Sequence, residues 1–452
     1  MSTHGDGRAD VIVIGAGMSG LKAASDLVAQ GRSVIVLEAS ERVGGRLKHA
    51  SVAGRDCDVG GQWVAPKHTM LLDEARRFGI ETYPQYTDGK TVLQLLGKLT
   101  QFTGEVPKMP VMALLELLRL QRRWDRDMAT VPADAPWTAS RAKAWDAITL
   151  DSWIEKNVRT KAARAFARLV PRSTWAADAS QISYLWFLDA LRSNGGLAYL
   201  MAVRSGMLDA KFKGGMHQVA ARMADALGQR VVLGAPVRRI IQASDGARIV
   251  TDKGEFKGRF VIVAIPPGPA QRIQYEPHLP AARDFLEQRM PMGAIIKVIV
   301  AYKEAFWRRS GFSGQAATDD DTLGIVMDDV QDVGPPMLLC FTDGPHAIAL
   351  SALGKEARKE KVIASLVKFF GPEASDPIGY DDNDWTTEPW THGYVGHMPP
   401  GTMTTFGPAL RAPCGRIHWA GTETSTEWAG CIEGALRAGA RAAQEIALRH
   451  NQ

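Results

Sequence analysis

The strongest chemical signal in the sequence is a glycine-rich turn near its start. Residues 11–20, VIVIGAGMSG, run from four apolar β-branched residues into the spacing G-x-G-x-x-G. Gly15 permits a tight strand-to-helix turn, Gly17 lets the backbone approach a pyrophosphate, and Gly20 allows close packing of the helix on the strand. Glu38 follows at the end of the next expected strand, where its carboxylate can accept hydrogen bonds from ribose hydroxyls. The sequence therefore predicts a dinucleotide site.

A second glycine pair decides between the two common dinucleotides. Residues 41–46, ERVGGR, place Gly44 and Gly45 shortly after Glu38 and follow them with Arg46. The pair lets more backbone approach the nucleotide, and the arginine puts a cation near its phosphates. A nicotinamide enzyme has little use for this extension, so the sequence favours FAD over NAD.

Lys297 is the next residue that could do chemistry. It lies within residues 293–302, GAIIKVIVAY, where apolar residues on both sides predict a strand with little water around it. A lysine in such a place is costly unless it has a partner. From the pattern alone, Lys297 could equally face solvent from a strand with one wet face.

These motifs resemble those of the flavin monoamine oxidase family of FAD-dependent enzymes, in particular its soluble bacterial type. The ERVGGR stretch is similar to the extended FAD fingerprint of the amine oxidase and glutathione reductase type. Residues 415–439, GRIHWAGTETSTEWAGCIEGALRAG, are similar to the flavin-contacting segment of the family. The similarity covers essentially the whole chain, with further matches in order at DVGGQWV (58–64), ISYLWFL (182–188), FVIVAIPP (260–267), PMGAIIKVIVAY (291–302) and MPPGTMTTFG (398–407).

The resemblance implies a specific FAD site. A helix that begins near Gly430 would aim its N–H groups at the pyrimidine edge of the flavin, where negative charge develops on reduction. In the family the backbone around Ile432 makes that contact, Thr422 and Glu423 lie by the pyrophosphate, and Val237 pairs with adenine through its backbone. Together with the motif residues, the expected cofactor-binding set is Gly15, Gly17, Met18, Ser19, Gly20, Glu38, Ala39, Gly44, Gly45, Arg46, Gly61, Gln62, Trp63, Val237, Trp385, Gly421, Thr422, Glu423 and Ile432. Trp385 is expected on the isoalloxazine, with a core tryptophan as the alternative.

The resemblance also implies two catalytic residues, Lys297 and Tyr394. The matching lysine of the family holds a water against flavin N5, next to the carbon that meets oxygen. Tyr394 supplies one of the two parallel aromatic rings that line the path of the amine in the family, but the position of the other ring is Cys431. This pair of rings, the aromatic cage, is therefore half open here, which leaves more room for the substrate in front of the flavin.

A second departure from the family concerns flavin attachment. Covalently flavinylated members carry a cysteine that attaches the ring, and the equivalent residue here, directly before Tyr394, is Gly393. No thiol is present to form that bond. The expected cofactor is therefore non-covalently bound FAD.

The expected substrate pocket is apolar. Residue-by-residue carry-over from the family gives Leu200, Met201, Leu208, Ile325, Met327, Phe341, Tyr394 and Cys431, with Trp63 beside them. This set holds no arginine to grip a carboxylate and no acid for the far end of a diamine. The sequence therefore favours a small apolar primary amine, such as a cycloalkylamine. Its oxidation gives an imine that hydrolyses to a ketone or aldehyde and ammonia, while O2 is reduced to H2O2.

Three alternatives stay open at this point. A dehydrogenase or desaturase of the same superfamily would pass electrons to another acceptor, although Lys297 argues against it. An oxidase could act instead on diamines or on nicotine-like cyclic amines. A non-enzymatic protein could keep FAD only as a scaffold for partner binding.

The expected elements fit an α/β fold. Strands at 11–14 and 33–40 flank a helix at 18–31, and this βαβ unit opens the chain. Helices dominate between about 83 and 211, a β-rich stretch follows from 230 to 302, and a long helix closes the chain at 430–450. A Rossmann-type FAD-binding domain is expected at 1–82, 212–288 and 388–452, interleaved with a substrate domain of β-sheet flanked by helices at 83–211 and 289–387. Within the helical part, an amphipathic helix is expected at 111–128 and a buried one at 182–192.

Composition and charge argue against several other classes. The 452 residues carry a net charge of only +5, and the basic stretch QRRWDRD at 121–127 is interleaved with acids, which predicts a solvated helix face and no nucleic-acid partner. The four cysteines lie far apart and the ten histidines form no ligand motif, so no metal site is expected. The sequence shows no secretion signal and no apolar run of membrane-spanning length, which favours a cytoplasmic protein without membrane contact. A homodimer is left open.

Overall fold

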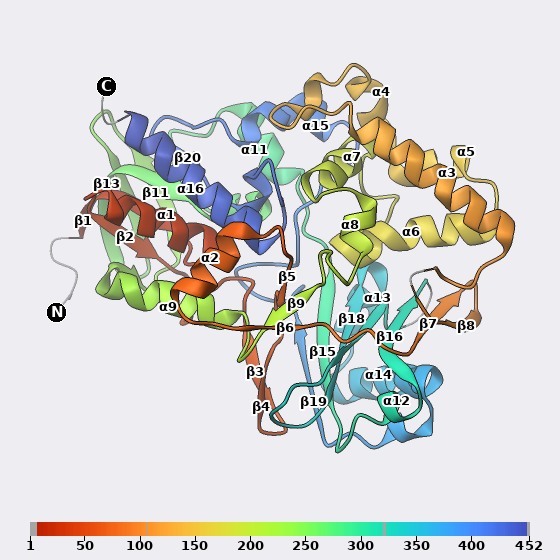
Figure 1. Cartoon of the computed structure of the whole chain (residues 1–452). Coiled ribbons are helices and arrows are strands. Elements are labelled where there is room, and N and C mark those ends of the chain that lie inside the picture. Colours follow the sequence, from red (N-terminus) through yellow and green to blue (C-terminus); the bar gives the residue numbers. More distant parts are fainter. Residues whose placement is uncertain (1–6, 105, 320–321, 450–452) are drawn as a thin grey trace.

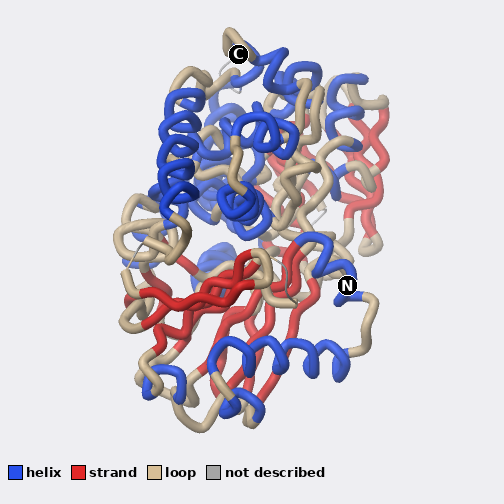
Figure 2. Tube along the Cα trace, turned by 90° about the vertical axis from the view of Figure 1, so that its right-hand side faces the viewer, coloured by secondary structure: helices blue, strands red, loops and turns tan. Residues whose placement is uncertain are grey.

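Two large β-sheets, two small ones and a cluster of helices make up the computed structural model, which describes residues 7–104, 106–319 and 322–449 (Figure 1). The strands fall into two separate groups when the molecule is viewed from the side (Figure 2). The chain passes repeatedly between the two groups, so residues far apart in the sequence meet where the groups face each other.

The first sheet carries the glycine-rich turn. Its strands are β1 (Arg8–Ile14), β2 (Val34–Leu37), β10 (Val231–Val232), β11 (Val237–Gln242), β12 (Ala247–Thr251), β13 (Gly254–Val263), β14 (Gln274–Glu276) and β20 (Ile417–Trp419). They lie in the order β10-β2-β1-β13-β12-β11-β14, and β20 pairs with the second half of β13. β1 runs parallel to both β2 and β13, and its apolar residues are buried, as expected for a strand covered on both faces.

Two helices cover one face of this sheet beside the turn (Figure 1). They are α1 (Met18–Ala29) and α16 (Ile432–Arg449), and α2 (Thr69–Arg77) and α9 (His217–Leu227) pack next to them. A Cβ atom on Gly439 would lie only 2.2 Å from the Ser19 carbonyl oxygen, so α16 can approach α1 this closely only with glycine there. The small residues of the last helix therefore bring its N-terminal end to the turn after β1.

The second sheet carries Lys297. Its strands are β7 (Lys90–Leu95), β8 (Lys98–Phe102), β15 (Ile295–Ala301), β16 (Phe312–Thr318), β17 (Ile325–Asp329), β18 (Met337–Asp343) and β19 (Gly379–Asp384), in the order β19-β15-β18-β17-β16-β7-β8. Ile296 and Val298 pack in the same core as α14 (Lys355–Phe370). Because side chains alternate along a strand, Lys297 points to the opposite face, toward the first sheet's connections.

The helical region packs around aromatic side chains. Its helices are α3 (Val111–Met128), α4 (Ala142–Asp146), α5 (Leu150–Asn157), α6 (Lys161–Trp175), α7 (Tyr184–Ser193) and α8 (Leu197–Met201). The rings of Trp153 and Tyr184 stack at 4.6 Å between centroids, and Trp124 meets Phe187 edge to face at 4.8 Å. These contacts fix α3, α5 and α7 against one another.

Short elements complete the chain. A hairpin of β3 (His49–Val52) and β4 (Arg55–Asp58) and a small sheet of β5 (Trp63–Val64), β9 (Ala210–Phe212) and β6 (Thr82–Pro84) connect the larger units. The remaining α-helices are α10 (Pro267–Ala270), α11 (Ala281–Gln288), α12 (Phe306–Arg309), α13 (Gly344–Ser351) and α15 (Thr402–Phe406).

The structure confirms the mixed α/β class and most of the expected elements. The opening βαβ unit, the helix at 111–128, the buried helix at 182–192 and the closing helix are all present. One element was missed, because β7 and β8 form a hairpin within the stretch expected to be mainly helical. β7 also pairs with β16, so long-range pairing outweighs the local helical signal. The domain boundaries stay a prediction.

Candidate active site

A cavity extends from the turn after β1 to the face of β15 that carries Lys297. Its lining comes from both sheets and from their connections: residues of 14–19, 37–39, 44–47, 60–63, 237–238, 264–273, 385–394 and 430–435, together with His68, Met207, Leu208, Ile295, Lys297, Phe341 and Thr422. The resulting space is long enough to place one end beside a glycine-rich helix terminus and the other beside a buried lysine.

The glycine-rich turn has the geometry of a pyrophosphate cradle. α1 begins after Gly17 with no side-chain cap and no acid in its first turn, so backbone N–H groups and positive potential remain at that end. A Cβ atom on Gly17 would meet nothing within 4 Å, which leaves this side of the turn open to a ligand. A Cβ on Gly20 would lie 1.9 Å from the Gly15 carbonyl oxygen, which confirms that Gly20 permits close helix–strand packing.

Glu38 is held ready beside this turn. One carboxylate oxygen accepts the Ala16 N–H at 2.7 Å, and the other accepts the N–H and hydroxyl of Ser40, both at 2.9 Å. The side chain is buried at the cavity wall, where the remaining lone pairs of its oxygens can accept ribose hydroxyls.

The second glycine pair packs directly on the first turn. Gly44 donates its N–H to the Ala16 carbonyl at 2.8 Å, and a Cβ atom on Gly45 would lie 3.4 Å from the Cα of Gly17. Both glycines have positive φ, at +99° and +57°, a region that L side chains rarely adopt. The pair therefore lets the following loop form one wall of the cavity against the turn.

A second helix N-terminus points at the same cavity. Cys431 and Ile432, at the start of α16, line it. The carboxylate of Glu433 is fully buried and turned away, because it accepts the N–H groups of Met70 and Leu71 at 3.2 and 2.9 Å. The donors of the first turn of α16 are thus left to the cavity side. Two helix N-termini at one cavity, one open glycine and one buried ribose acceptor fit FAD, which would lie between α1 and α16.

Lys297 is buried at the wall between the two sheets. Its side chain is 2% exposed, and its ammonium donates to the Gly60 carbonyl at 2.9 Å and to the amide oxygen of Gln62. The rings of Trp63 and Phe341 flank the nitrogen, with centroids at 5.8 and 5.5 Å. Burial lowers the pKa of Lys297 to about 8, although Asp58 and other nearby anionic groups oppose the shift.

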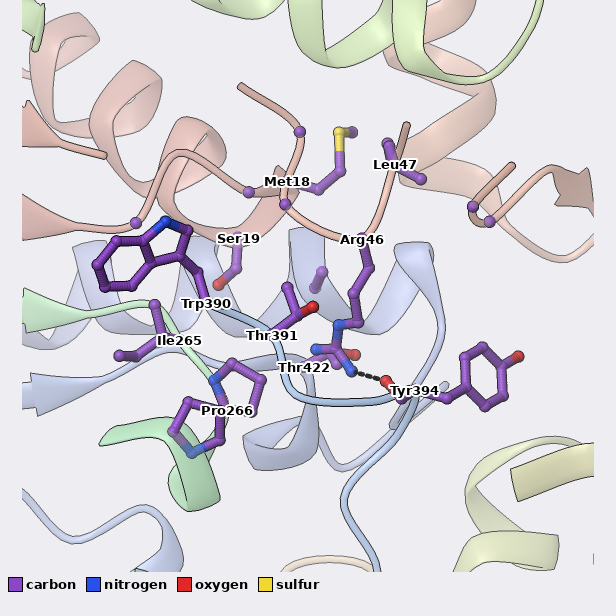
Figure 3. A pocket seen from close by; sticks show the side chains of 18 of the residues that line it. Met18, Ser19, Arg46, Leu47, Ile265, Pro266, Trp390, Thr391, Tyr394 and Thr422 are labelled. Carbon is purple, nitrogen blue, oxygen red and sulfur yellow. Dashed lines mark hydrogen bonds between the residues drawn. The ribbon is translucent and has the colours of Figure 1, made fainter. Parts of the chain in front are cut away.

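Tyr394 is positioned through its own backbone. Arg46 donates to the Tyr394 carbonyl at 2.6 Å and to the Glu423 carboxylate at 2.9 Å, so the loop after β2 is tied to two C-terminal segments. Figure 3 shows Arg46 reaching this carbonyl while the Tyr394 ring points away from it. Burial raises the pKa of the Tyr394 phenol to about 12, so the ring is uncharged at neutral pH.

Cys431 lies at the end of the cavity beside Tyr394 and is turned toward α7. Its thiol donates to the amide oxygen of Asn194 at 3.1 Å, and Asn194 is itself fixed by a bond to the Ala190 carbonyl at 2.9 Å. Burial raises the pKa of Cys431 to about 12. The thiol is therefore protonated and its sulfur is held toward Asn194.

Most of the expected cofactor-binding residues line one continuous cavity. These are Gly15, Gly17, Met18, Ser19, Glu38, Ala39, Gly44, Gly45, Arg46, Gly61, Gln62, Trp63, Val237, Trp385, Thr422 and Ile432. Gly20, Gly421 and Glu423 lie behind the lining, where Gly421 packs on the Ile265 carbonyl and Glu423 holds Arg46. Trp385 donates its indole N–H to the Val59 carbonyl at 2.8 Å.

The expected substrate residues divide into two groups. Leu208, Phe341, Tyr394 and Cys431 line the cavity, with Phe341 beside Lys297. Ile325 and Met327 belong to the apolar cluster behind Phe341, Leu200 packs among the helices, and Met201 is exposed. A substrate role for these four residues stays a prediction.

Several cavity residues were not found from the sequence. His68, Met207 and Trp390 also line it. The His68 imidazole accepts the Ala65 N–H at 3.2 Å, and burial lowers its pKa to about 4, so it is uncharged. A lone histidine or apolar residue outside a motif has no spacing that separates it from ordinary core, so the sequence offered no signal for these positions.

Comparisons with known proteins agree with this geometry. Residues 18–447 match the family model of flavin containing amine oxidoreductases. The flavin-containing amine oxidase A of Equus caballus is 39% identical, over 97% of this chain and 84% of its own length. Among solved structures, cyclohexylamine oxidase from Brevibacterium oxydans IH-35A is 33% identical with a TM-score of 0.93, covering 98% of this chain and 100% of that one. Wild-type putrescine oxidase bound to putrescine is 32% identical with a TM-score of 0.94, covering 98% and 99%.

The chain therefore belongs to the flavin-containing amine oxidoreductase family. It is a flavin-dependent amine oxidase, and its cofactor is FAD. Across the part of the chain that the structure describes, no three His, Cys, Asp or Glu side chains are grouped to hold a metal ion. Among those same residues, every helix is too short or too polar to cross a membrane.

The first prediction concerns flavin attachment. We expect acid or heat denaturation of the purified yellow protein to release FAD into the supernatant. Gly393 has φ +135°, and a Cβ atom there would lie 2.7 Å from the Gly293 carbonyl oxygen, so the usual attachment position has no room for a cysteine side chain. The remaining thiol at the cavity, that of Cys431, stays protonated and unreactive. Flavin absorbance that stays with the precipitated polypeptide would contradict non-covalent binding.

Proposed function

We propose that this enzyme oxidises a small apolar primary amine, with cycloalkylamines as the favoured class. The amine becomes an imine, which hydrolyses to a ketone or aldehyde and ammonia, and O2 is reduced to H2O2. Bound FAD would carry the electrons from the amine to oxygen. Lys297 and Tyr394 are the proposed catalytic residues, and Leu208, Phe341 and Cys431 are the proposed pocket residues beside them.

The observation that carries this choice is the charge of the cavity lining. Among its described residues, Glu38 is the one carboxylate, and it is engaged at the turn after β1. Arg46 lines the cavity but is paired with Glu423. The second ammonium of a diamine would be desolvated in this cavity with no free carboxylate in the described lining to pair with it, which is costly. An apolar monoamine avoids that cost.

Several titratable groups of the cavity lining are uncharged, which suits a neutral substrate. Tyr394 and Cys431 have pKa values raised to about 12 by burial, and His68 has one lowered to about 4, so none carries charge near neutrality. Trp63 and Phe341 add apolar surface. Such a lining excludes water and favours the neutral amine, the form with the lone pair that oxidation requires. No residue has to act as a strong base.

Lys297 is suited to the oxygen half of the reaction. Its ammonium donates two hydrogen bonds, to the Gly60 carbonyl and to the Gln62 amide oxygen. The third N–H is then available to hold a water at the cavity. A cation fixed in a dry site stabilises negative charge that develops on oxygen more strongly than a solvated one does. This role supports oxygen, and not a quinone or a protein, as the electron acceptor.

Putrescine oxidase and cyclohexylamine oxidase resemble this chain about equally in overall structure, so overall similarity does not choose between their substrates. The lack of a free carboxylate in the described lining supports a monoamine substrate, and a diamine oxidase is the second candidate. A wild-type enzyme that prefers putrescine to cyclohexylamine in kcat/KM would overturn the proposed substrate class while leaving the family unchanged.

The second prediction tests the half-open cage at Cys431. We expect Cys431→Tyr to shift the ratio of kcat/KM for cyclohexylamine to that for benzylamine by about fivefold toward benzylamine. A second ring beside Tyr394 narrows the site and favours a flat substrate, and aromatic contacts of this kind are worth about 1 kcal/mol. Steady-state kinetics with both amines measure the ratio. Cys431→Ser keeps the width of the site beside Tyr394, so this matched control should leave the ratio unchanged. A Cys431→Tyr variant with an unchanged ratio would contradict the proposed role of Cys431.

The third prediction separates the two half-reactions at Lys297. We expect Lys297→Met to leave FAD bound and anaerobic reduction by the amine largely intact, but to slow reoxidation by O2 about a hundredfold. Stopped-flow mixing of the reduced enzyme with oxygen measures this rate. An unchanged rate of reoxidation in Lys297→Met would show that Lys297 has only a structural role.

The pH dependence of the wild type is the fourth prediction. Lys297 has its pKa lowered to about 8, so its cationic form predominates below that pH and is lost above it. Reoxidation should therefore slow as the pH rises through about 8, while reduction at limiting amine should become faster as more amine is neutral. Stopped-flow traces over this range measure both slopes, and the reoxidation slope should be absent in Lys297→Met. Parallel slopes in the wild type would contradict the assignment.

A further inference from the structure

Lys297 takes its hydrogen-bond acceptors from one short segment of the chain. The Gly60 carbonyl and the amide oxygen of Gln62 both belong to the connection that leads from β4 into β5. The backbone of this connection is fixed, because Gly61 donates its N–H to the Arg46 carbonyl at 3.1 Å. Gly60 acts through its backbone, so Gln62 is the acceptor of this pair whose chemistry a side-chain substitution can change.

The amide of Gln62 can have only one orientation toward Lys297. An ammonium has no lone pair that accepts a hydrogen bond, so the atom of Gln62 that faces it must be the oxygen. The Nε2 group then faces elsewhere, and it is buried with no hydrogen-bond partner among the described residues. Leaving an amide N–H buried and unpaired costs free energy. An apolar side chain of similar length would avoid that cost, so packing alone does not explain a glutamine at this position.

A buried ammonium is sensitive to the loss of either acceptor. Lys297 donates to two described acceptors, and burial already lowers its pKa to about 8. An acceptor favours the charged form of an amine over the neutral form, so removing one lowers the pKa further. One hydrogen bond from Gln62 can therefore decide whether the ammonium or the neutral amine predominates at neutral and mildly alkaline pH.

The other ionisable groups that act on Lys297 come from three strands. Apart from burial, which lowers its pKa, Asp58 and Cys57 of β4 and Asp329 of β17 raise it, and Lys211 of β9 lowers it. Asp329 is paired with Lys211, and Asp58 accepts a backbone N–H directly before α9 at 2.8 Å. The Cys57 thiol is uncharged near neutrality, because burial raises its pKa to about 12. These groups all stay in place when the side chain of Gln62 alone is changed.

We propose that Gln62 is a positioning residue that keeps Lys297 charged and directed for the reaction with oxygen. Its amide oxygen holds one N–H of the ammonium beside the Gly60 carbonyl, which leaves the third N–H at the cavity. Gln62 itself exchanges neither protons nor electrons. O2 takes two electrons and two protons from the reduced cofactor and becomes H2O2, while Lys297 stabilises the negative charge that develops on oxygen. This role of Gln62 rests on the proposed function of Lys297 and is independent of which amine the enzyme oxidises.

The fifth prediction concerns the pH at which reoxidation slows. Gln62→Met keeps the length of the side chain but removes the acceptor, so the midpoint of the reoxidation profile should fall by about one pH unit. Gln62→Glu places a carboxylate against the ammonium, so the midpoint should rise by about one pH unit or more. Stopped-flow mixing of the reduced, FAD-loaded variants with O2 measures each midpoint, over about two pH units on either side of that of the wild type.

The two opposite shifts separate this role from a structural one. A general loosening of the cavity wall would move the profiles of Gln62→Met and Gln62→Glu in the same direction. Gln94 is a buried glutamine of β7 that is not part of the described cavity lining, so Gln94→Met is the matched control and should leave the midpoint unchanged. The flavin absorbance of each purified variant verifies that FAD is loaded before the profile is measured.

The outcomes that contradict the role of Gln62 differ from those that contradict the role of Lys297. Wild-type midpoints in both Gln62 variants, with a wild-type slope that Lys297→Met abolishes, would overturn the role of Gln62 and leave that of Lys297 intact. Shifts of both variants in one direction would assign Gln62 to the structure of the wall and overturn its role as well. A wild-type profile without a slope would overturn both roles together.

Discussion

A buried ammonium joins the two sheets of this enzyme around one cavity. Lys297 comes from β15, the strand next to the edge strand β19 of the second sheet, while Gly60 and Gln62, which accept its hydrogen bonds, come from a connection of the first. An ammonium this far from water must keep its acceptors, so the two sheets are held in one relative position. The glycine turn and the Tyr394 segment line the same cavity as this ammonium.

Burial also keeps several groups of the cavity lining uncharged. Desolvation keeps the phenol of Tyr394, the thiol of Cys431 and the imidazole of His68 neutral, and it lowers the pKa of Lys297 into the range where small changes matter. Charged residues are instead used for scaffolding, as when Arg46 and Glu423 tie three segments together. Desolvation therefore accounts both for the neutral side chains of the lining and for the lowered pKa of Lys297.

The sequence predicts those parts of the molecule whose spacing is dictated by local geometry. The turn at Gly15, the parallel βαβ unit and the long final helix follow from residue types within a short window. His68 and Met207 could not be found, because long-range packing alone brings them to the cavity. The β7–β8 hairpin was missed because its pairing with β16 involves residues far along the chain. The burial of Asp127, within the stretch expected to be a solvated face, was equally hidden, since sequence order does not show which face of α3 is covered.

The most direct test of this account is an anaerobic titration of the oxidised enzyme with cyclohexylamine, followed by admission of air. The account predicts that the amine bleaches the visible absorbance of the flavin and that air restores it with release of H2O2. Bleaching that air does not reverse, but that a quinone does, would identify a dehydrogenase. Flavin that dithionite reduces but that neither cyclohexylamine, benzylamine nor putrescine bleaches would contradict the central claim that the cavity oxidises amines.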